Sequence, residues 1–138
     1  MRVLLVLVSA LLSSCDSSKA YDVCKYRGNS GAERVCSLSF LYLAAHPEKF
    51  DAVSVEFVGW ARVAGDSILI FPTLDAMEGG DSVSSVVVYD GNDSFDELNL
   101  RGSGSRIRIS GIFHLNDGKL DPMDIERIGV IQHAKFSR

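Results

Sequence analysis

The sequence predicts a mainly β (α+β) fold, in which one N-terminal helix precedes a five-stranded, partly open barrel. Five short segments after residue 52 either alternate apolar with polar residues or are almost wholly apolar, as strands do. One earlier segment, residues 37–46, carries apolar residues at helical spacing. The longest alternating segment has Gly59 on its inward side, where a missing side chain lets a strand bend at a barrel corner. Five strands with a bent first strand favour a barrel over a sandwich, which needs about seven.

The chain begins with a segment typical of a secretory signal. Residues 3–12 are apolar except for Ser9, and they follow the positively charged start Met1-Arg2. This run is too short to span a bilayer, which needs about 20 apolar residues, but it suits the core of a signal peptide. Its end, Leu12-Ser13-Ser14-Cys15, resembles the lipobox of bacterial lipoproteins, in which an aliphatic residue and two small residues precede a cysteine.

The lipobox resemblance implies that the thiol of Cys15 receives a diacylglycerol, that the chain is cut before it, and that the new amine is acylated. Several acyl chains, at about 0.8 kcal/mol per buried methylene, hold a protein on a membrane persistently. We therefore expect a signal peptide at 1–14, a tether at 15–23 and a single domain at 24–138 that faces the periplasm. Asp16, directly after this Cys, resembles the signal that retains lipoproteins of enterobacteria in the inner membrane, which is therefore the expected location, with the outer membrane as the alternative. The competing interpretation is an ordinary cleaved signal, with Cys15 as a disulfide partner.

Length and charge limit the partners that the chain can have. Without residues 1–14, 124 of the 138 residues remain, enough for one core but not for two. The formal net charge is −4, and loss of the segment that contains Arg2 makes it −5. A mildly acidic domain has no electrostatic reason to bind nucleic acid or anionic lipid.

Cys24 and Cys36 form an even pair once Cys15 carries lipid, and an exported protein meets oxidising conditions. The turn-rich stretch Gly28-Asn29-Ser30-Gly31 between them can fold the chain back. We predict a structural disulfide, which stabilises by roughly 3 kcal/mol in the chain-entropy model. A metal pair and a redox pair are the alternatives, but neither Cys-x-x-Cys spacing nor a nearby His supports them.

The elements are predicted from periodicity. The helix at 37–46 is expected to turn Leu38, Leu41, Tyr42 and Ala45 inward and to end at Pro47. The long strand, Val53 to Val63, has its odd-numbered residues inward. The other predicted elements are strands at 68–71, 84–89, 106–113 and 125–131, a helical turn at 74–77, a brief helix at 93–100, and a frayed end at 134–138.

Two sequence stretches resemble small bacterial periplasmic and lipoprotein domains of OB-fold type. They are Ala45-His46-Pro47-Glu48-Lys49-Phe50-Asp51 with Val55-x-Phe57-x-Gly59-Trp60, and Arg106-Ile107-Arg108-Ile109-Ser110-Gly111-Ile112-Phe113. The resemblance spans most of 37–131 and implies an OB-like barrel, but no shared activity. The chain departs from the pattern at Ala52-Val53, where Gly-Lys is preferred.

Four residues are candidates for a partner surface: Trp60, Arg62, Arg106 and Arg108. An OB-fold can bind nucleic acid through aromatic platforms in a basic groove. Here the second and third strands lie in an acidic region, which repels phosphate. We expect instead that Arg106 or Arg108 pairs with Glu56 across strands and that Trp60 covers the outer sheet.

The acidic region is residues 72–100, which contain seven acidic residues and no Lys or Arg. Asp90, Asp93 and Asp96 are weak candidates for a calcium site, because clustered oxygens suit a hard cation. Phe95, however, stands where an EF-hand loop has Gly. The three His are isolated, so no zinc site is predicted.

No nucleophile elbow, P-loop or dinucleotide fingerprint occurs, so no enzyme, catalytic residue or cofactor is predicted. The expected function is non-catalytic binding of a protein or another envelope component, with the membrane contacted through the N-terminal lipid. The alternatives are a module that binds a small ligand or cation through segment 73–100, and an enzyme with an unrecognised site.

Overall fold

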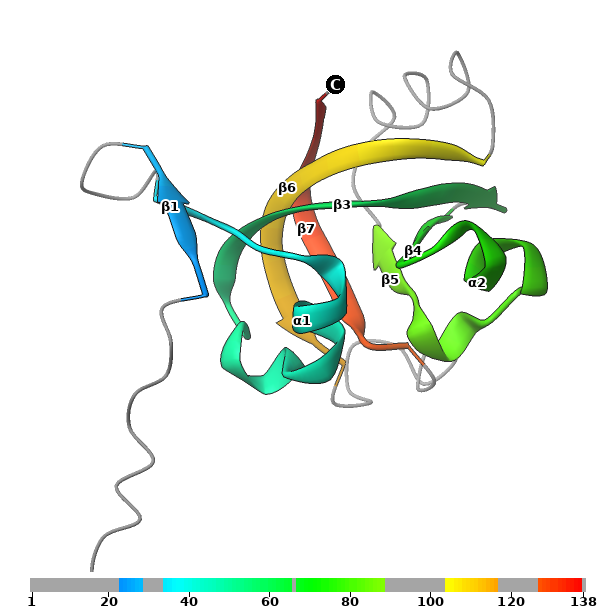
Figure 1. Cartoon of the computed structure of the whole chain (residues 1–138), viewed down its shortest axis with the longest axis horizontal. Helices are drawn as coiled ribbons and strands as arrows, with labels where there is room; N and C mark the ends of the chain where they lie inside the picture. The colour runs from blue at the N-terminus through cyan, green and yellow to red at the C-terminus, as the bar shows by residue number, and fades with distance from the viewer. Residues whose placement is uncertain (1–22, 29–33, 66, 89–103, 117–126, 138) are drawn as a thin grey trace, which may run out of the picture.

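The computed structural model describes residues 23–28, 34–65, 67–88, 104–116 and 127–137 of the chain. Figure 1 shows long, curved strands wrapped around a core, with a short hairpin projecting on one side. The strands are β1 Lys25–Arg27, β2 Val35–Ser37, β3 Val53–Ala64, β4 Ser67–Phe71, β5 Val86–Val88, β6 Ser105–Leu115 and β7 Gly129–Ser137. The helices are α1 Phe40–Ala45 and α2 Leu74–Gly79, with 3-10 turns η1 Pro47–Lys49 and η2 Ser82–Ser84.

Five of the described strands, β3 to β7, form a closed barrel. The sheet has the strand order β1-β2-β3-β4-β5-β7-β6, and the barrel closes because β3 also pairs with β6. Closure depends on the 12-residue length of β3, which pairs with β6 from Val53 to Ala61 and with β4 from Trp60 to Ala64. The predicted mainly β barrel is confirmed, but the described strands close it rather than leaving it partly open.

Gly59 lies where β3 changes partners. A Cβ at this position would come within 2.5 Å of Ile70 Cγ2 and 2.9 Å of the Phe71 carbonyl oxygen on β4. The backbones of β3 and β4 therefore approach more closely than any side chain here would allow. The alternation predicted for β3 is confirmed, because Val55, Phe57, Gly59 and Ala61 are all buried.

Helix α1 packs on the core with a different face from the one predicted. Ser39 caps the helix by accepting a hydrogen bond from the Tyr42 backbone N–H, so the helix begins at Phe40. Phe40 and Leu43 are buried, and the Phe40 ring meets the Phe57 ring edge-on at 5.0 Å. Leu41, predicted to point inward, is 65% exposed. The prediction was wrong for Leu41 and for Ala45, which is also exposed, because it counted the helical period from Leu38, which precedes the first helical residue. Leu38 and Tyr42 do pack against the core, as predicted.

The segment before α1 is a hairpin, β1–β2, joined to the barrel. Cys24 and Cys36 form the predicted disulfide, with Cα atoms 4.8 Å apart. Cys36 is fully buried, and β2 runs parallel to β3 with Cys36 opposite Val55. The disulfide and this short ladder fix the hairpin beside the start of β3.

The other end of the barrel carries α2. The predicted helical turn is confirmed: Thr73 caps it, and Gly80 ends it in the left-handed conformation. Leu69, Phe71, Met77, Val87 and Val130 form a second buried cluster, against which Trp60, Leu74 and Ala76 pack. The outer faces of β4 and β5 are thus covered by α2 (Figure 1).

Strand β7 is longer than predicted. It runs to Ser137 and pairs with β6 from Leu115↔Gly129 to Arg108↔Ser137, with a bulge between Ser110 and Ile112. The prediction that residues 134–138 fray was therefore wrong for 134–137. The continuous ladder to β6 holds this end in place.

Candidate functional site

Three hollows with shared lining residues lie along α1, the hairpin and strands β3 and β6, and together they are called the trough. The central hollow, of about 450 Å³, lies between the start of α1 and strands β3 and β6. One neighbour, of about 250 Å³, lies at the hairpin, and the other, also about 250 Å³, lies at β6 and the end of β7. The lining residues are Val23, Lys25, Ser37, Leu38, Ser39, Phe40, Leu41, Glu56, Phe57, Val58, Pro72, Arg106, Ile107, Arg108 and Ser137.

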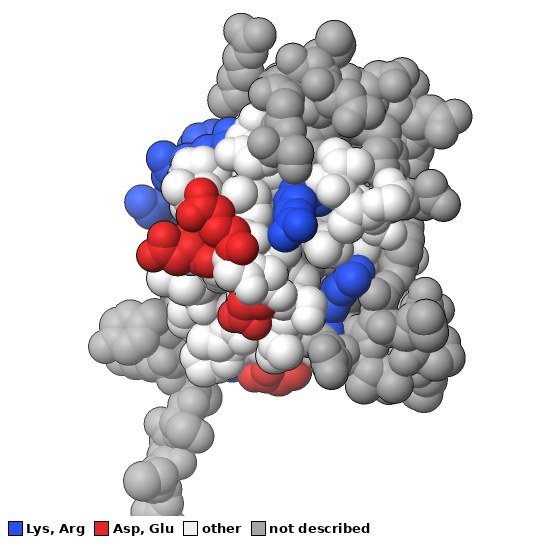
Figure 2. Space-filling model, turned by 90° about the vertical axis from the view of Figure 1, so that its right-hand side faces the viewer, with Lys and Arg blue, Asp and Glu red and all other residues white. Residues whose placement is uncertain are grey.

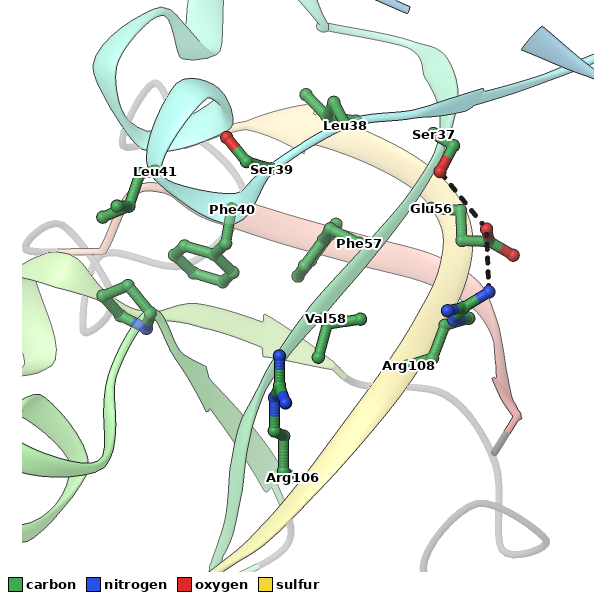
Figure 3. A pocket seen from close by; sticks show the side chains of 11 residues that line it. Ser37, Leu38, Ser39, Phe40, Leu41, Glu56, Phe57, Val58, Arg106 and Arg108 are labelled. Carbon is green, nitrogen blue, oxygen red and sulfur yellow. Dashed lines mark hydrogen bonds and ion pairs between the residues drawn. The ribbon is translucent and has the colours of Figure 1, made fainter. Parts of the chain in front are cut away.

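The floor of the trough is apolar. Figure 3 shows Phe40 and Phe57 side by side beneath it, with Leu38 and Leu41 above them and Val58 toward β6. Phe40 and Phe57 are buried, so they belong to the core as well as to the floor. Leu41 is the exposed apolar member of the lining.

Glu56 is the acidic member of the lining, and its charge is compensated. Its Oε1 lies 3.4 Å from Arg27 Nη1 and 3.7 Å from Arg108 Nη1. The Ser37 hydroxyl donates to the same oxygen at 3.4 Å. The prediction that an arginine of β6 pairs with Glu56 is confirmed for Arg108 (Figure 3).

Two cations of the trough have no such compensation. In Figure 3 the guanidinium of Arg106 points along the trough beside Val58. Across the residues that the structure describes, the side chains of Arg106 and Lys25 form neither an ion pair nor a hydrogen bond. Lys25 lines the hairpin end of the trough and Arg106 lines the β6 end. The trough therefore offers an apolar floor between two free positive charges.

The four residues predicted as a partner surface are divided between two places. Arg106 and Arg108 line the trough, but Trp60 packs against the cluster under α2. Arg62 donates from Nη1 to the Met77 carbonyl oxygen at 3.4 Å and so contacts α2 too. The trough and the α2 cluster are nevertheless neighbours in the sheet, because Trp60 on β3 lies opposite Arg106 on β6.

Sequence reasoning missed two members of the trough, Lys25 and Leu41. Leu41 was assigned to the core by the helical period. Lys25 lies more than 80 positions before Arg106 in the chain, and no local pattern joins them. The sequence could have placed Leu41 correctly: if Ser39 is taken as the N-cap, the helix starts at Phe40, and Leu41 then lies on the exposed face.

Other predicted sites lie outside the described residues. Cys15, Asp90, Asp93 and Asp96 belong to this group, as does the predicted helix at 93–100. Among the residues with described positions, no group of three or more His, Cys, Asp or Glu could hold a metal ion. No helix in the described ranges has the length and apolar character to cross a membrane.

The face that carries α2 is electrostatically mixed. Figure 2 shows several acidic side chains grouped on this face and others apart from that group, with basic side chains standing apart from one another. α2 and the turn after it contribute Asp75, Glu78 and Asp81. The described part of this face lacks the continuous basic stripe that a phosphate backbone requires.

No family model, curated protein or solved structure matches this chain.

Proposed function

We propose that the protein is a bacterial lipoprotein, anchored by lipid on Cys15 at the periplasmic side of a membrane, whose barrel is a non-catalytic module for binding a protein partner. The sequence Leu12-Ser13-Ser14-Cys15 supports the anchor, because a thiol after two small residues is what the lipobox reaction needs. The trough supports the binding function. The observation that carries it is that the exposed Leu41 and the uncompensated Arg106 line the same hollow.

The topology supports an OB-type barrel. β5 and β7 are parallel neighbours and all other neighbours in the barrel are antiparallel, as in a five-stranded Greek-key barrel of that type. Its second and third strands, here β4 and β5, usually form the ligand face. In this protein Leu69, Phe71 and Val87 on that face are buried under α2. Binding is therefore assigned to the trough, between α1, β3 and β6.

The chemistry of the trough fits a protein rather than a reacting substrate. Protein interfaces combine apolar anchors with arginine, whose planar guanidinium can bind a carboxylate through two hydrogen bonds at once. The trough presents Leu41 and the edge of the Phe40–Phe57 pair beside Arg106. The Glu56 carboxylate is held by two arginines and a serine, so its own charge is already compensated.

Two experiments test the proposal. Mass spectrometry of the protein extracted from membranes should find an acylated N-terminus at Cys15, and Cys15→Ser should be released uncut and unacylated. A photo-crosslinking amino acid at position 41 of the anchored chain should form adducts with a protein partner. The same group at Val83, which is 62% exposed compared with 65% for Leu41, is the matched control. Equal adducts at both positions, or none at position 41, would contradict the binding function.

A further inference from the structure

We infer that the trough binds an extended, acidic segment of the partner protein, with carboxylate side chains at Lys25 and Arg106 and an apolar side chain at Leu41. This inference rests on the proposed binding function and adds the chemistry of the ligand. It is carried by three features of the trough: its charge, its length and its apolar middle.

The charge of the trough is opposite to that of the chain. Among the residues with described positions, the lining contains three cations, Lys25, Arg106 and Arg108, and one carboxylate, Glu56, in a protein whose formal net charge is −4. Glu56 is already paired with Arg108 and with Arg27 from the hairpin. Lys25 and Arg106 form no ion pair among the described residues, and a carboxylate of the partner could form an ion pair with each. Charge-assisted hydrogen bonds of this kind are about twice as strong as neutral ones.

The length of the trough indicates a segment that passes through it. The hairpin hollow shares Ser37, Leu38 and Ser39 with the central hollow, and the central hollow shares Val58, Arg106 and Arg108 with the third. A chain terminus is usually captured in a nest of backbone N–H groups at one point. Here the two cations without an ion pair are separated by the central hollow: Lys25 lines the hairpin hollow, and Arg106 lies where the central hollow meets the third. An internal segment with acidic residues on both sides of an apolar one fits that spacing.

The middle of the trough supplies the apolar contact. Leu38, Leu41 and Val58 flank the central hollow, and side chains of an extended segment point alternately to opposite sides. An apolar residue between two acidic ones can therefore turn toward Leu41 while its neighbours reach the cations. The rival occupant is a second copy of this chain, because its own residues 72–100 are acidic and carry apolar residues.

The test measures binding of defined peptides to the full anchored chain, extracted in detergent. Three labelled, C-terminally amidated peptides of one length are compared by fluorescence anisotropy: one with Glu flanking Leu, one with Gln in place of Glu, and one with Lys. A fourth, the Gln peptide with a free C-terminal carboxylate, tests capture of a terminus. We expect the Glu peptide to bind at least about tenfold more tightly than the others, since the loss of one charged hydrogen bond costs about that factor.

Variants of the protein locate the site. Arg106→Glu and Lys25→Glu should each weaken binding of the Glu peptide about tenfold or more. Lys49→Glu, the same charge change on η1 outside the trough, should leave it within about twofold. Leu41→Ser should weaken binding, whereas Val83→Ser should not. Unchanged thermal melting of each variant shows that the barrel is intact.

Several results would overturn the inference. They are equal binding of the Glu and Gln peptides, tighter binding of the free-carboxylate peptide, no binding of the Glu peptide, and an equal effect of Lys49→Glu and Arg106→Glu. Self-association in light scattering that Arg106→Glu abolishes would assign the trough to a second copy instead. If adducts at position 41 persist while the Glu peptide fails to bind, the inference falls and the proposed function stands; if those adducts are absent too, both fall.

Discussion

Arg108 on β6 pairs with Glu56 on β3 diagonally, at 3.7 Å, although the strand register places Arg108 opposite Val58. This pairing occupies the Glu56 carboxylate, so that among the described residues Arg106, whose register partner is Trp60, has no ion pair. The Arg108 side chain is 37% exposed and that of Arg27 is 64% exposed, so solvent screens both pairs. Their main consequence is the distribution of charge in the trough, and their contribution to stability is less than about 1 kcal/mol each.

We predict that Glu56→Gln tightens binding of the acidic peptide. The substitution removes the carboxylate that the described residues contribute to the trough, and it leaves Arg27 and Arg108 without this partner. The affinity of the Glu peptide should rise by about threefold to tenfold at low salt, and the gain should shrink as salt screens the charges. Urea unfolding should change by less than about 1 kcal/mol. Weaker peptide binding by Glu56→Gln would show that Glu56 serves binding itself.

Gly59→Ala should destabilise the barrel. The added methyl would meet Ile70 Cγ2 and the backbone carbonyl of Phe71, and only the first of these can move without shifting β4. We expect a loss of about 1–3 kcal/mol in the free energy of unfolding, measured with urea. Gly79→Ala, in α2 with open space around its Cβ position, is the control and should be neutral or stabilising by up to about 1 kcal/mol.

Ala52→Gly should stabilise the protein. Ala52 has φ 58°, the left-handed region, and its N–H donates to the Phe113 carbonyl oxygen at 2.8 Å. A residue with a Cβ is strained in this region by about 1–2 kcal/mol, and glycine removes that strain. Part of the gain is offset because glycine gives the unfolded chain more conformational entropy. We expect a net gain of about 0.5–1 kcal/mol in thermal or urea unfolding. A decrease would show that the Ala52 methyl makes a favourable contact that outweighs the strain.

Loss of the disulfide should affect both stability and the trough. Cys24→Ala with Cys36→Ala removes a cross-link over 12 positions, which stabilises by about 2–4 kcal/mol. The hairpin that it fixes carries Lys25 and leads into Ser37 and Leu38 at the rim. Peptide affinity should therefore fall at temperatures where the barrel is still folded by circular dichroism. Unchanged affinity would mean that the β2–β3 ladder alone holds the hairpin.

The strands and the disulfide were predictable because their signals are local. Alternation located β3 and β6 to within a few residues, and Gly59 marked the bend. The close approach at Gly59 also shows what the glycine is for, since the backbone of β4 occupies the space of its side chain. Position 52 has a different requirement, because its positive φ suits glycine better than alanine.

The errors have non-local causes. Closure of the barrel depends on pairing between β3 and β6, whose residues are about 50 positions apart, and alternation alone says nothing of it. From the sequence alone, the end of β7 is predicted to fray, because its pairing with β6 depends on residues far away in the chain. The trough joins Lys25, Leu41 and Arg106 from three separate elements, so only the fold brings them together.

The Cys24–Cys36 bond also decides how a mechanical pull on the N-terminal end reaches the rest of the molecule. Tension that enters at Val23 passes at Cys24 into a covalent bond and emerges at Cys36, beside Val55. Strand β1 lies outside this path and bears none of this force. Unfolding under such a pull would therefore begin no earlier than at β2. Lys25, which lies in the loop closed by the disulfide, would keep its place in the trough under load.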